Sequence, residues 1–135
     1  MKHQIEIVYE GDLCTKAVHL SSGSQIVTDA PLDNNGKGEK FSPTDLVATA
    51  LGSCMLTIMG MAAKSQKLDI SNTRVKVEKV MGKDPRKIAQ VNIEIYFSTP
   101  VSDKHKLILE RAAHHCPVAK TLDGNIEENI KFIYE

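Results

Sequence analysis

The 135-residue sequence lacks several features that mark common functional classes. Its basic and acidic residues balance at 17 each, so no strong electrostatic field would gather nucleic acid or an anionic membrane surface. The first residues hold no apolar run long enough for the core of a signal peptide, and we expect no stretch that approaches a transmembrane span. These absences predict one domain over residues 1–135, in the cytoplasm, with no nucleic-acid or membrane partner.

Motifs for several kinds of chemistry are also missing. No Gly-x-Gly-x-x-Gly, Walker loop or Gly-x-Ser-x-Gly occurs, so nothing supports nucleotide binding or serine-hydrolase chemistry. Only three cysteines are present, and cytoplasmic thiols are kept reduced, so a standing disulfide framework is not expected. The triplet "HHC" at 114–116 is a weak metal signal, because adjacent residues do not easily point at one ion. We expect no metal and no cofactor.

The sequence does contain alternating strand patterns and two helical patterns. Ile5, Ile7 and Tyr9 alternate with polar residues before a Gly-Asp turn and a second strand-like run, which is typical of a hairpin. Residues 24–30 add a third strand, residues 73–82 and 87–99 flank a turn as a second hairpin, and residues 125–135 close the chain as a strand. Helices are expected at 102–115 and just after Cys116. This order predicts an α+β fold with antiparallel sheets.

The clearest element is a long helix that begins near residue 42. Ser42 is a good N-cap, Pro43 fits the first turn, and Asp45 completes a Ser-x-x-Asp capping pattern. Apolar residues then recur at the helical period and form a broad stripe, with Cys54 expected in the middle of the buried face. The helix has more apolar surface than one thin sheet would cover, and this suggests an intertwined dimer.

Two of the cysteines are arranged for chemistry. In "AHHCPVAKTL", proline at a first helical position places Cys116 at the N-cap of a short helix, where the helix dipole favours a thiolate. Cys54 is followed by apolar residues and preceded by Gly52 and Ser53, which let another group come close. A lone cysteine on an apolar stripe is usually a small hydrophobe, but the two together suggest an attacking and a resolving thiol. Cys14, in an early strand, is expected to be structural.

These motifs resemble the OsmC/Ohr family of organic hydroperoxide reductases. The similarity lies in "SPTDLVATALGSC", where a helix start leads into Cys54, and in "HHCPVAKTL", the Cys-Pro second site. It implies an interwoven homodimer with the long helices at its centre. It further implies that Cys54 is the peroxidatic thiol that attacks the peroxide, and that Cys116 is the resolving thiol that forms a disulfide with it. The partners implied are an organic hydroperoxide and an external thiol or dithiol reductant, with no cofactor.

The sequence departs from the family pattern at the group that activates the peroxidatic thiol. Family enzymes pair an arginine with a glutamate there, but no arginine occurs before Arg74. Thr44 stands where the glutamate is expected, with Asp45 one position later. Lys37 or Lys40 is a candidate substitute, although a lysine lacks the planar fork of arginine. Two alternatives therefore stay open: a redox-sensing or small-molecule-binding homodimer with little turnover, and a structural homodimer with inert cysteines.

Overall fold

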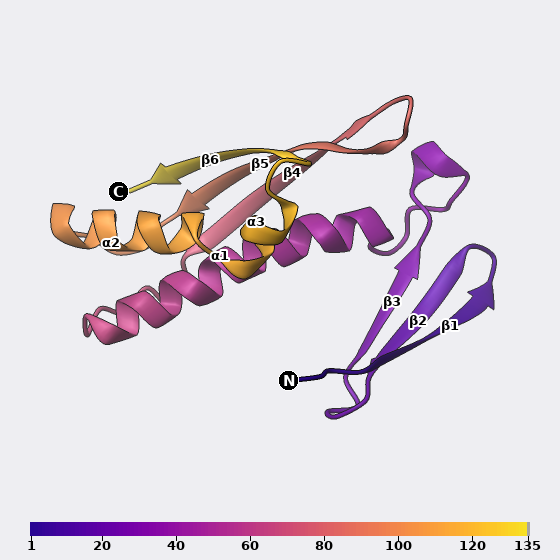
Figure 1. The fold of residues 1–135 in the computed structure, drawn as a ribbon, viewed down its shortest axis with the longest axis horizontal. Helices are drawn as coiled ribbons and strands as arrows, with labels where there is room; N and C mark the ends of the chain where they lie inside the picture. The colour runs from indigo at the N-terminus through magenta and orange to yellow at the C-terminus, as the bar shows by residue number, and fades with distance from the viewer. Residues whose placement is uncertain (135) are drawn as a thin grey trace. The chain divides into compact units, whose positions relative to one another are not determined.

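The computed structural model describes residues 1–134 and has the expected mixed α+β architecture (Figure 1). The chain divides into two compact units, residues 1–46 and the residues from 47 onward, and each is described separately. Each unit contains one three-stranded sheet, ordered β1-β2-β3 and β4-β5-β6. The elements are β1 (Ile5–Gly11), β2 (Cys14–His19), β3 (Gln25–Asp29), a 3-10 turn (Leu32–Asn34), α1 (Pro43–Ser65), β4 (Arg74–Gly82), β5 (Lys87–Tyr96), α2 (Asp103–His114), α3 (Pro117–Leu122) and β6 (Glu127–Ile133).

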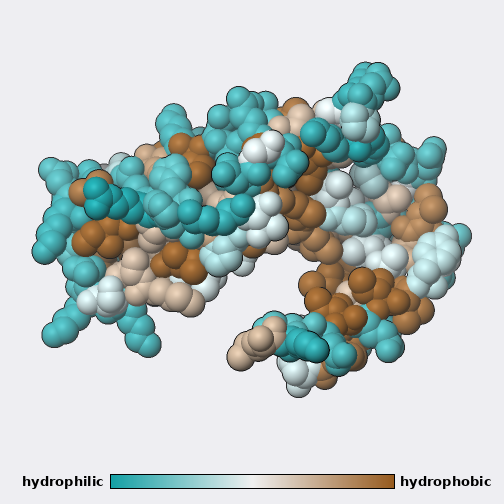
Figure 2. Space-filling view, in the orientation of Figure 1, coloured by the Kyte–Doolittle hydropathy of each residue, from teal (hydrophilic) through white to brown (hydrophobic). Residues whose placement is uncertain are grey.

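The first unit is a thin antiparallel sheet with an uncovered apolar face. The register pairs Ile7 with Ala17 and Ala17 with Ile26, so these side chains share one face. Tyr9 lies on the same face, and Ile7 and Tyr9 are 64% and 65% exposed. Brown apolar side chains are visible over this sheet in Figure 2. The buried residues within 1–46 are all polar: Thr28, Asp29 and Ser42.

The second unit corrects one detail of the expected topology. Strands β4 and β5 pair antiparallel, but β6 pairs parallel to β5, so the expectation of purely antiparallel sheets was wrong at this edge. The reason is the connection: α2 and α3 lie between β5 and β6 and carry the chain back across the sheet, as a parallel pair requires. Alternate residues of β5, among them Val91, Ile93 and Ile95, are fully buried and form the centre of the core.

Helix α1 begins with the predicted capping box. The Asp45 amide donates to Ser42 Oγ at 3.0 Å, and the Ser42 amide donates to an Asp45 carboxylate oxygen at 2.9 Å. The helix is 23 residues long, with a mean hydropathy of 1.8 over its most apolar window, which is long and apolar enough to cross a membrane. The expectation of no such stretch was therefore wrong. Leu51, Met55 and Met59 on one side of α1 are fully buried in the protein core, and core helices also meet that criterion.

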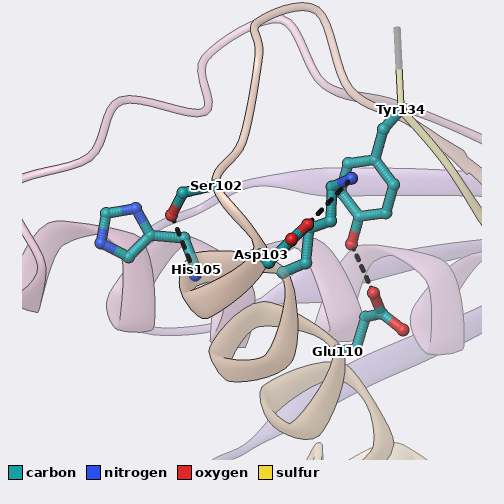
Figure 3. Close-up of polar contacts among 6 residues, drawn as sticks. Ser102, Asp103, His105, Glu110 and Tyr134 are labelled. Carbon is teal, nitrogen blue, oxygen red and sulfur yellow. Dashed lines mark hydrogen bonds and ion pairs between the residues drawn. The ribbon is translucent and has the colours of Figure 1, made fainter.

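The C-terminal end of the chain is fastened to α2. Figure 3 shows the Tyr134 ring above α2 with its hydroxyl directed at Glu110; the hydroxyl donates to the Glu110 carboxylate at 2.7 Å. The ring stacks on Phe97 at a centroid distance of 4.6 Å. Ser102 caps α2 as predicted, accepting from the His105 amide at 3.2 Å. These contacts hold α2, and therefore the chain that leads from it into α3, against the sheet.

Candidate functional site

Cys54 lies on the flank of the buried face of α1, and this corrects the expectation that it lies in the middle of that face. Its neighbours Leu51 and Met55 are fully buried, whereas Cys54 is half-buried. It packs against the core cluster while part of its side chain stays accessible. The helical stripe is broad enough to include Cys54 by periodicity, but the sheet covers only one side of the stripe. A half-buried cysteine is more useful for chemistry than a fully buried one, because a reactant has less packed structure to cross.

Gly52 brings α1 close to strand β4. A Cβ atom at this position would lie 2.9 Å from Val77 Cγ2 and 3.3 Å from Val75 Cγ1, so the helix approaches the sheet more closely than a side chain would allow. The sequence suggested that the small residues before Cys54 admit a close neighbour, and the structure confirms it. The neighbour of Gly52 is the β4 strand. The close approach fixes the height of Cys54 above the sheet.

Cys116 occupies the predicted N-cap of α3. Its backbone is extended, with φ −68° and ψ 148°, Pro117 follows in the first turn, and Cys116 Sγ accepts a hydrogen bond from the Ala119 amide at 3.3 Å. The side chain is 0% exposed. Proline favours this arrangement because its fixed φ suits the first helical position and it has no N–H to satisfy. The local sequence therefore determines where the sulfur points.

The electrostatic environment of Cys116 differs from the expectation. Burial raises the pKa of the Cys116 thiol, and the amides of Ala119 and Val118 lower it by a smaller amount. The Cys54 thiol adds to the raised pKa. The helix start does favour a thiolate, as predicted, but the loss of hydration outweighs it. At neutral pH Cys116 is consequently a protonated thiol rather than a thiolate.

The fold brings the two predicted thiols into contact. Cys54 and Cys116 are far apart in sequence, yet within the second unit the Cys54 thiol lies close enough to Cys116 to raise the pKa of its thiol. Both are free cysteines in this structure. The pair therefore combines an accessible sulfur on a long helix with a buried sulfur at a helix cap. Contact of this kind allows a disulfide to form once one sulfur has been oxidised.

The supporting residues named from the sequence belong to the first unit, where their local roles are visible. Asp45 is a member of the capping box at the start of α1. The Thr44 hydroxyl lies 3.2 Å from the Ser42 hydroxyl in the same turn. Both residues therefore stabilise the helix start. Whether either also acts on Cys54 stays a prediction.

Lys37 and Lys40 are both exposed in the loop before α1. Lys37 acts on Cys14, because its charge lowers the pKa of that thiol, although burial and the Asp29 carboxylate raise the pKa by more. The Cys14 thiol donates to Asp29 Oδ1 at 3.6 Å. The charge that acts on Cys14 therefore comes from the loop before α1. A protonated Cys14 is in keeping with a structural role.

His114, His115 and Arg74 make contacts with residues other than the two thiols. His115 Nδ1 lies 2.7 Å from the Arg111 carbonyl oxygen, and the His114 ring meets Phe132 edge-on. The Arg74 guanidinium lies over the Tyr96 ring at 5.1 Å. Because Val75 and Val77 face α1, the alternation of β4 places Arg74 on the opposite face of the sheet. Arg74 therefore does not replace the activating arginine of the family.

Comparisons with known proteins identify the family and the fold. The family model described as OsmC-like protein matches residues 36–131. A "putative osmotic stress induced and detoxification response protein" from Psychrobacter arcticus 273-4 is 47% identical, with a TM-score of 0.92 over 96% of this chain and 94% of that one. No curated protein sequence matches significantly.

More distant solved structures share the fold. The organic hydroperoxide resistance protein OsmC from Legionella pneumophila is 14% identical, with a TM-score of 0.77 over 98% of this chain and 96% of that one. The organic hydroperoxide resistance protein OhrB of Bacillus subtilis is 17% identical, with a TM-score of 0.73 over 98% of both chains.

Proposed function

The chain belongs to the OsmC-like protein family, and from this premise we propose that it is a thiol-dependent peroxidase that reduces organic hydroperoxides. The observation that carries the proposal is the contact between a half-buried Cys54 and a fully buried Cys116. The names of related proteins, organic hydroperoxide resistance proteins among them, support a peroxide-related role.

The first step takes place at Cys54. Its thiolate attacks the terminal oxygen of the hydroperoxide, the O–O bond breaks, and the alkoxide leaves and takes up a proton to become an alcohol. The sulfur loses two electrons to the peroxide and becomes a sulfenic acid. Cys54 packs against an apolar core cluster, so a hydroperoxide with an apolar tail gains more from binding there than hydrogen peroxide does.

The second step consumes the sulfenic acid. Cys116 attacks the Cys54 sulfur, the S–O bond breaks, and the hydroxyl leaves with a proton as water, which yields the Cys54–Cys116 disulfide. An external thiol or dithiol then returns two electrons. The Cys54 side chain already acts on the Cys116 thiol in the reduced protein, so we expect this step to need no large rearrangement of the second unit.

We also propose that the working form is a cytoplasmic homodimer. The apolar face of the β1-β2-β3 sheet exposes Ile5, Ile7, Tyr9 and Ile26, and a three-stranded sheet of this kind is marginal without a packing partner. Helix α1 also exposes Met61 at 63%. A second copy of the chain, with the same two surfaces, is the occupant that the family resemblance favours.

A thiol count tests the peroxidase proposal directly. Reduced protein, in a Cys14→Ser background, is treated with one equivalent of cumene hydroperoxide, and free thiols and intact mass are measured before and after. We expect the loss of two thiols and two hydrogens, mapped to Cys54 and Cys116 and reversed by a dithiol. The Cys14→Ser change is a suitable background because a serine hydroxyl keeps the hydrogen bond to Asp29.

Single variants assign the two roles. Cys54→Ser is expected to abolish peroxide consumption. Cys116→Ser should consume one equivalent, after which Cys54 stalls as a sulfenic acid or over-oxidises. Unchanged thiols after peroxide treatment would contradict the peroxidase proposal, and full turnover by Cys116→Ser without another thiol would contradict the resolving role.

One observation favours a slower alternative. The Cys116 thiol has a raised pKa, and Arg74 faces away from the site, so the pair lacks two features of a fast peroxidase. Reversible oxidation of both thiols with little steady-state turnover would identify a redox-sensing homodimer. Kinetics with excess dithiol separate the two functions.

A further inference from the structure

We infer that, in the oxidised protein, the external reductant attacks the sulfur of Cys54 and that Cys116 is the leaving thiol. The inference deepens the proposed function and rests on the disulfide that it requires. It assigns a direction to a step in which either sulfur of the disulfide can be the target.

The first argument is access. Cys54 is half-buried on the flank of α1, whereas Cys116 is 0% exposed. Ala113 and Ala119 stand three residues before and three residues after Cys116, and both are members of the buried core. A reducing thiol that arrives from solvent therefore meets the Cys54 sulfur first.

The second argument is direction of approach. In thiol–disulfide exchange the attacking, attacked and leaving sulfurs lie close to one line. Attack on Cys54 comes from the open flank of α1 with Cys116 behind it. Attack on Cys116 requires the reductant to approach from the side opposite Cys54, where the core and the start of α3 lie. That path is blocked unless the segment opens.

The third argument concerns the leaving sulfur. When the reductant forms its bond to Cys54, the S–S bond breaks and its electron pair stays on Cys116. The Ala119 amide, which donates to Cys116 Sγ at 3.3 Å in the reduced state, offsets part of the cost that burial imposes on the leaving thiolate. Cys116 then takes up a proton, so access and direction of approach, not the acidity of the leaving thiol, decide which sulfur is attacked. A second thiol then attacks the reductant's sulfur in the mixed disulfide, which releases Cys54 as a thiol and completes the two-electron reduction.

The experiment uses the full chain in the Cys14→Ser background, with the disulfide formed by diamide so that it does not depend on peroxide chemistry. The oxidised protein is mixed with excess glutathione, quenched in acid, digested with pepsin at low pH and mapped by mass spectrometry. We expect glutathione on Cys54 and a free thiol on Cys116. Glutathione on Cys116 would overturn the inference while leaving the peroxidase proposal intact.

A second measurement gives an answer even if the mixed disulfide is too short-lived to map. Two single-cysteine proteins, Cys116→Ser and Cys54→Ser in the same background, are reacted in the native state with an aromatic disulfide reagent. Rates are compared per thiolate, from full pH profiles, so that the different acidities of the two thiols cancel. We expect Cys54 to react roughly 100-fold faster or more, because exchange at Cys116 requires local opening of packed structure.

The two proteins are first shown to be folded by circular dichroism. Equal rates per thiolate would mean that Cys116 is as accessible as Cys54, and the inference would fall. A failure of the peroxidase proposal is recognised separately, because cumene hydroperoxide would then leave the thiols intact while diamide still links them.

Discussion

Replacement of Gly52 by alanine tests how closely α1 approaches the sheet beneath the site. Alanine in place of an interior helical glycine normally stabilises a protein by about 1 kcal/mol. Here the added Cβ would lie 2.9 Å from Val77 Cγ2, and Val77 is β-branched and has little freedom at χ1. Overpacking of this kind costs about 1–3 kcal/mol. The net effect of Gly52→Ala is therefore a destabilisation of about 0–2 kcal/mol.

Gly60 supplies the matched control on the same helix. A Cβ at Gly60 would have nothing within 4 Å, so Gly60→Ala should gain stability by about 1 kcal/mol. The free energy of unfolding of both variants is measured by urea denaturation at one fixed protein concentration, because an oligomer's stability depends on concentration. Their free energies of unfolding should differ by about 1–3 kcal/mol. The gain in helix propensity is common to both and cancels, so this difference reports the overpacking against Val77.

A double variant locates the contact. Val77→Ala removes the methyl groups that the new Cβ would meet, so Gly52→Ala should cost less in that background, with a coupling energy of about 1 kcal/mol or more. Gly52→Ala should also slow formation of the Cys54–Cys116 disulfide, because a displaced helix moves Cys54 two residues away. If Gly52→Ala were as stabilising as Gly60→Ala, the close approach of helix and sheet would be refuted.

Two further predictions concern pH and assembly. Because the pKa of Cys116 is raised in the folded protein, the thiol form stabilises the fold fully below the unfolded value of about 8.5, and this stability is lost as pH rises through the folded pKa. Urea unfolding of reduced Cys14→Ser protein should thus weaken more above pH 8.5 than that of the same protein with Cys116→Ala; equal pH dependence would count against the burial argument. Ile7→Lys, on the apolar face of the first sheet, should convert a dimer into a monomer in sedimentation, whereas Val8→Lys on the other face should not; a dimer that tolerates Ile7→Lys must use another surface.

Much of the fold could be predicted from local signals. The capping residues Ser42 and Asp45, the alternation in β5 and the proline after Cys116 each determine structure over a few residues, and each prediction was confirmed. The parallel pairing of β6 was missed because strand direction depends on the path between strands, and alternation within β6 carries no information about it. The two helices expected between β5 and β6 were a sequence signal for a crossover connection, which a parallel pair requires.

The sequence motifs single out the two candidate thiols, but they do not predict the environment of either one. Cys54 and Cys116 were chosen from sequence, and their contact is a tertiary property that spacing alone does not give. Helical periodicity cannot tell the centre of a buried face from its flank, so the half-exposure of Cys54 was missed. The direction of the Cys116 pKa shift could not be predicted, because burial raises this pKa by more than the helix dipole lowers it, and burial depends on elements far away in the sequence. The effect of Lys37 on Cys14 also depends on tertiary structure. Asp29 accepts a hydrogen bond from the Glu39 amide, and this bond holds the loop that carries Lys37.

The difference in exposure between the two thiols fits the separate roles that we propose for them. In the proposed mechanism the peroxidatic sulfur must be reached by its substrate, and Cys54 is only half-buried. The resolving sulfur must be protected from that substrate, and Cys116 is fully buried. A protonated and buried Cys116 is a poor target for peroxide, because the thiolate is the reactive form. Its contact with Cys54 nevertheless gives it a high effective concentration toward a sulfenic acid formed there. The raised pKa of Cys116 thus slows the disulfide step. The same burial protects the Cys116 thiol from peroxide until a sulfenic acid forms at Cys54.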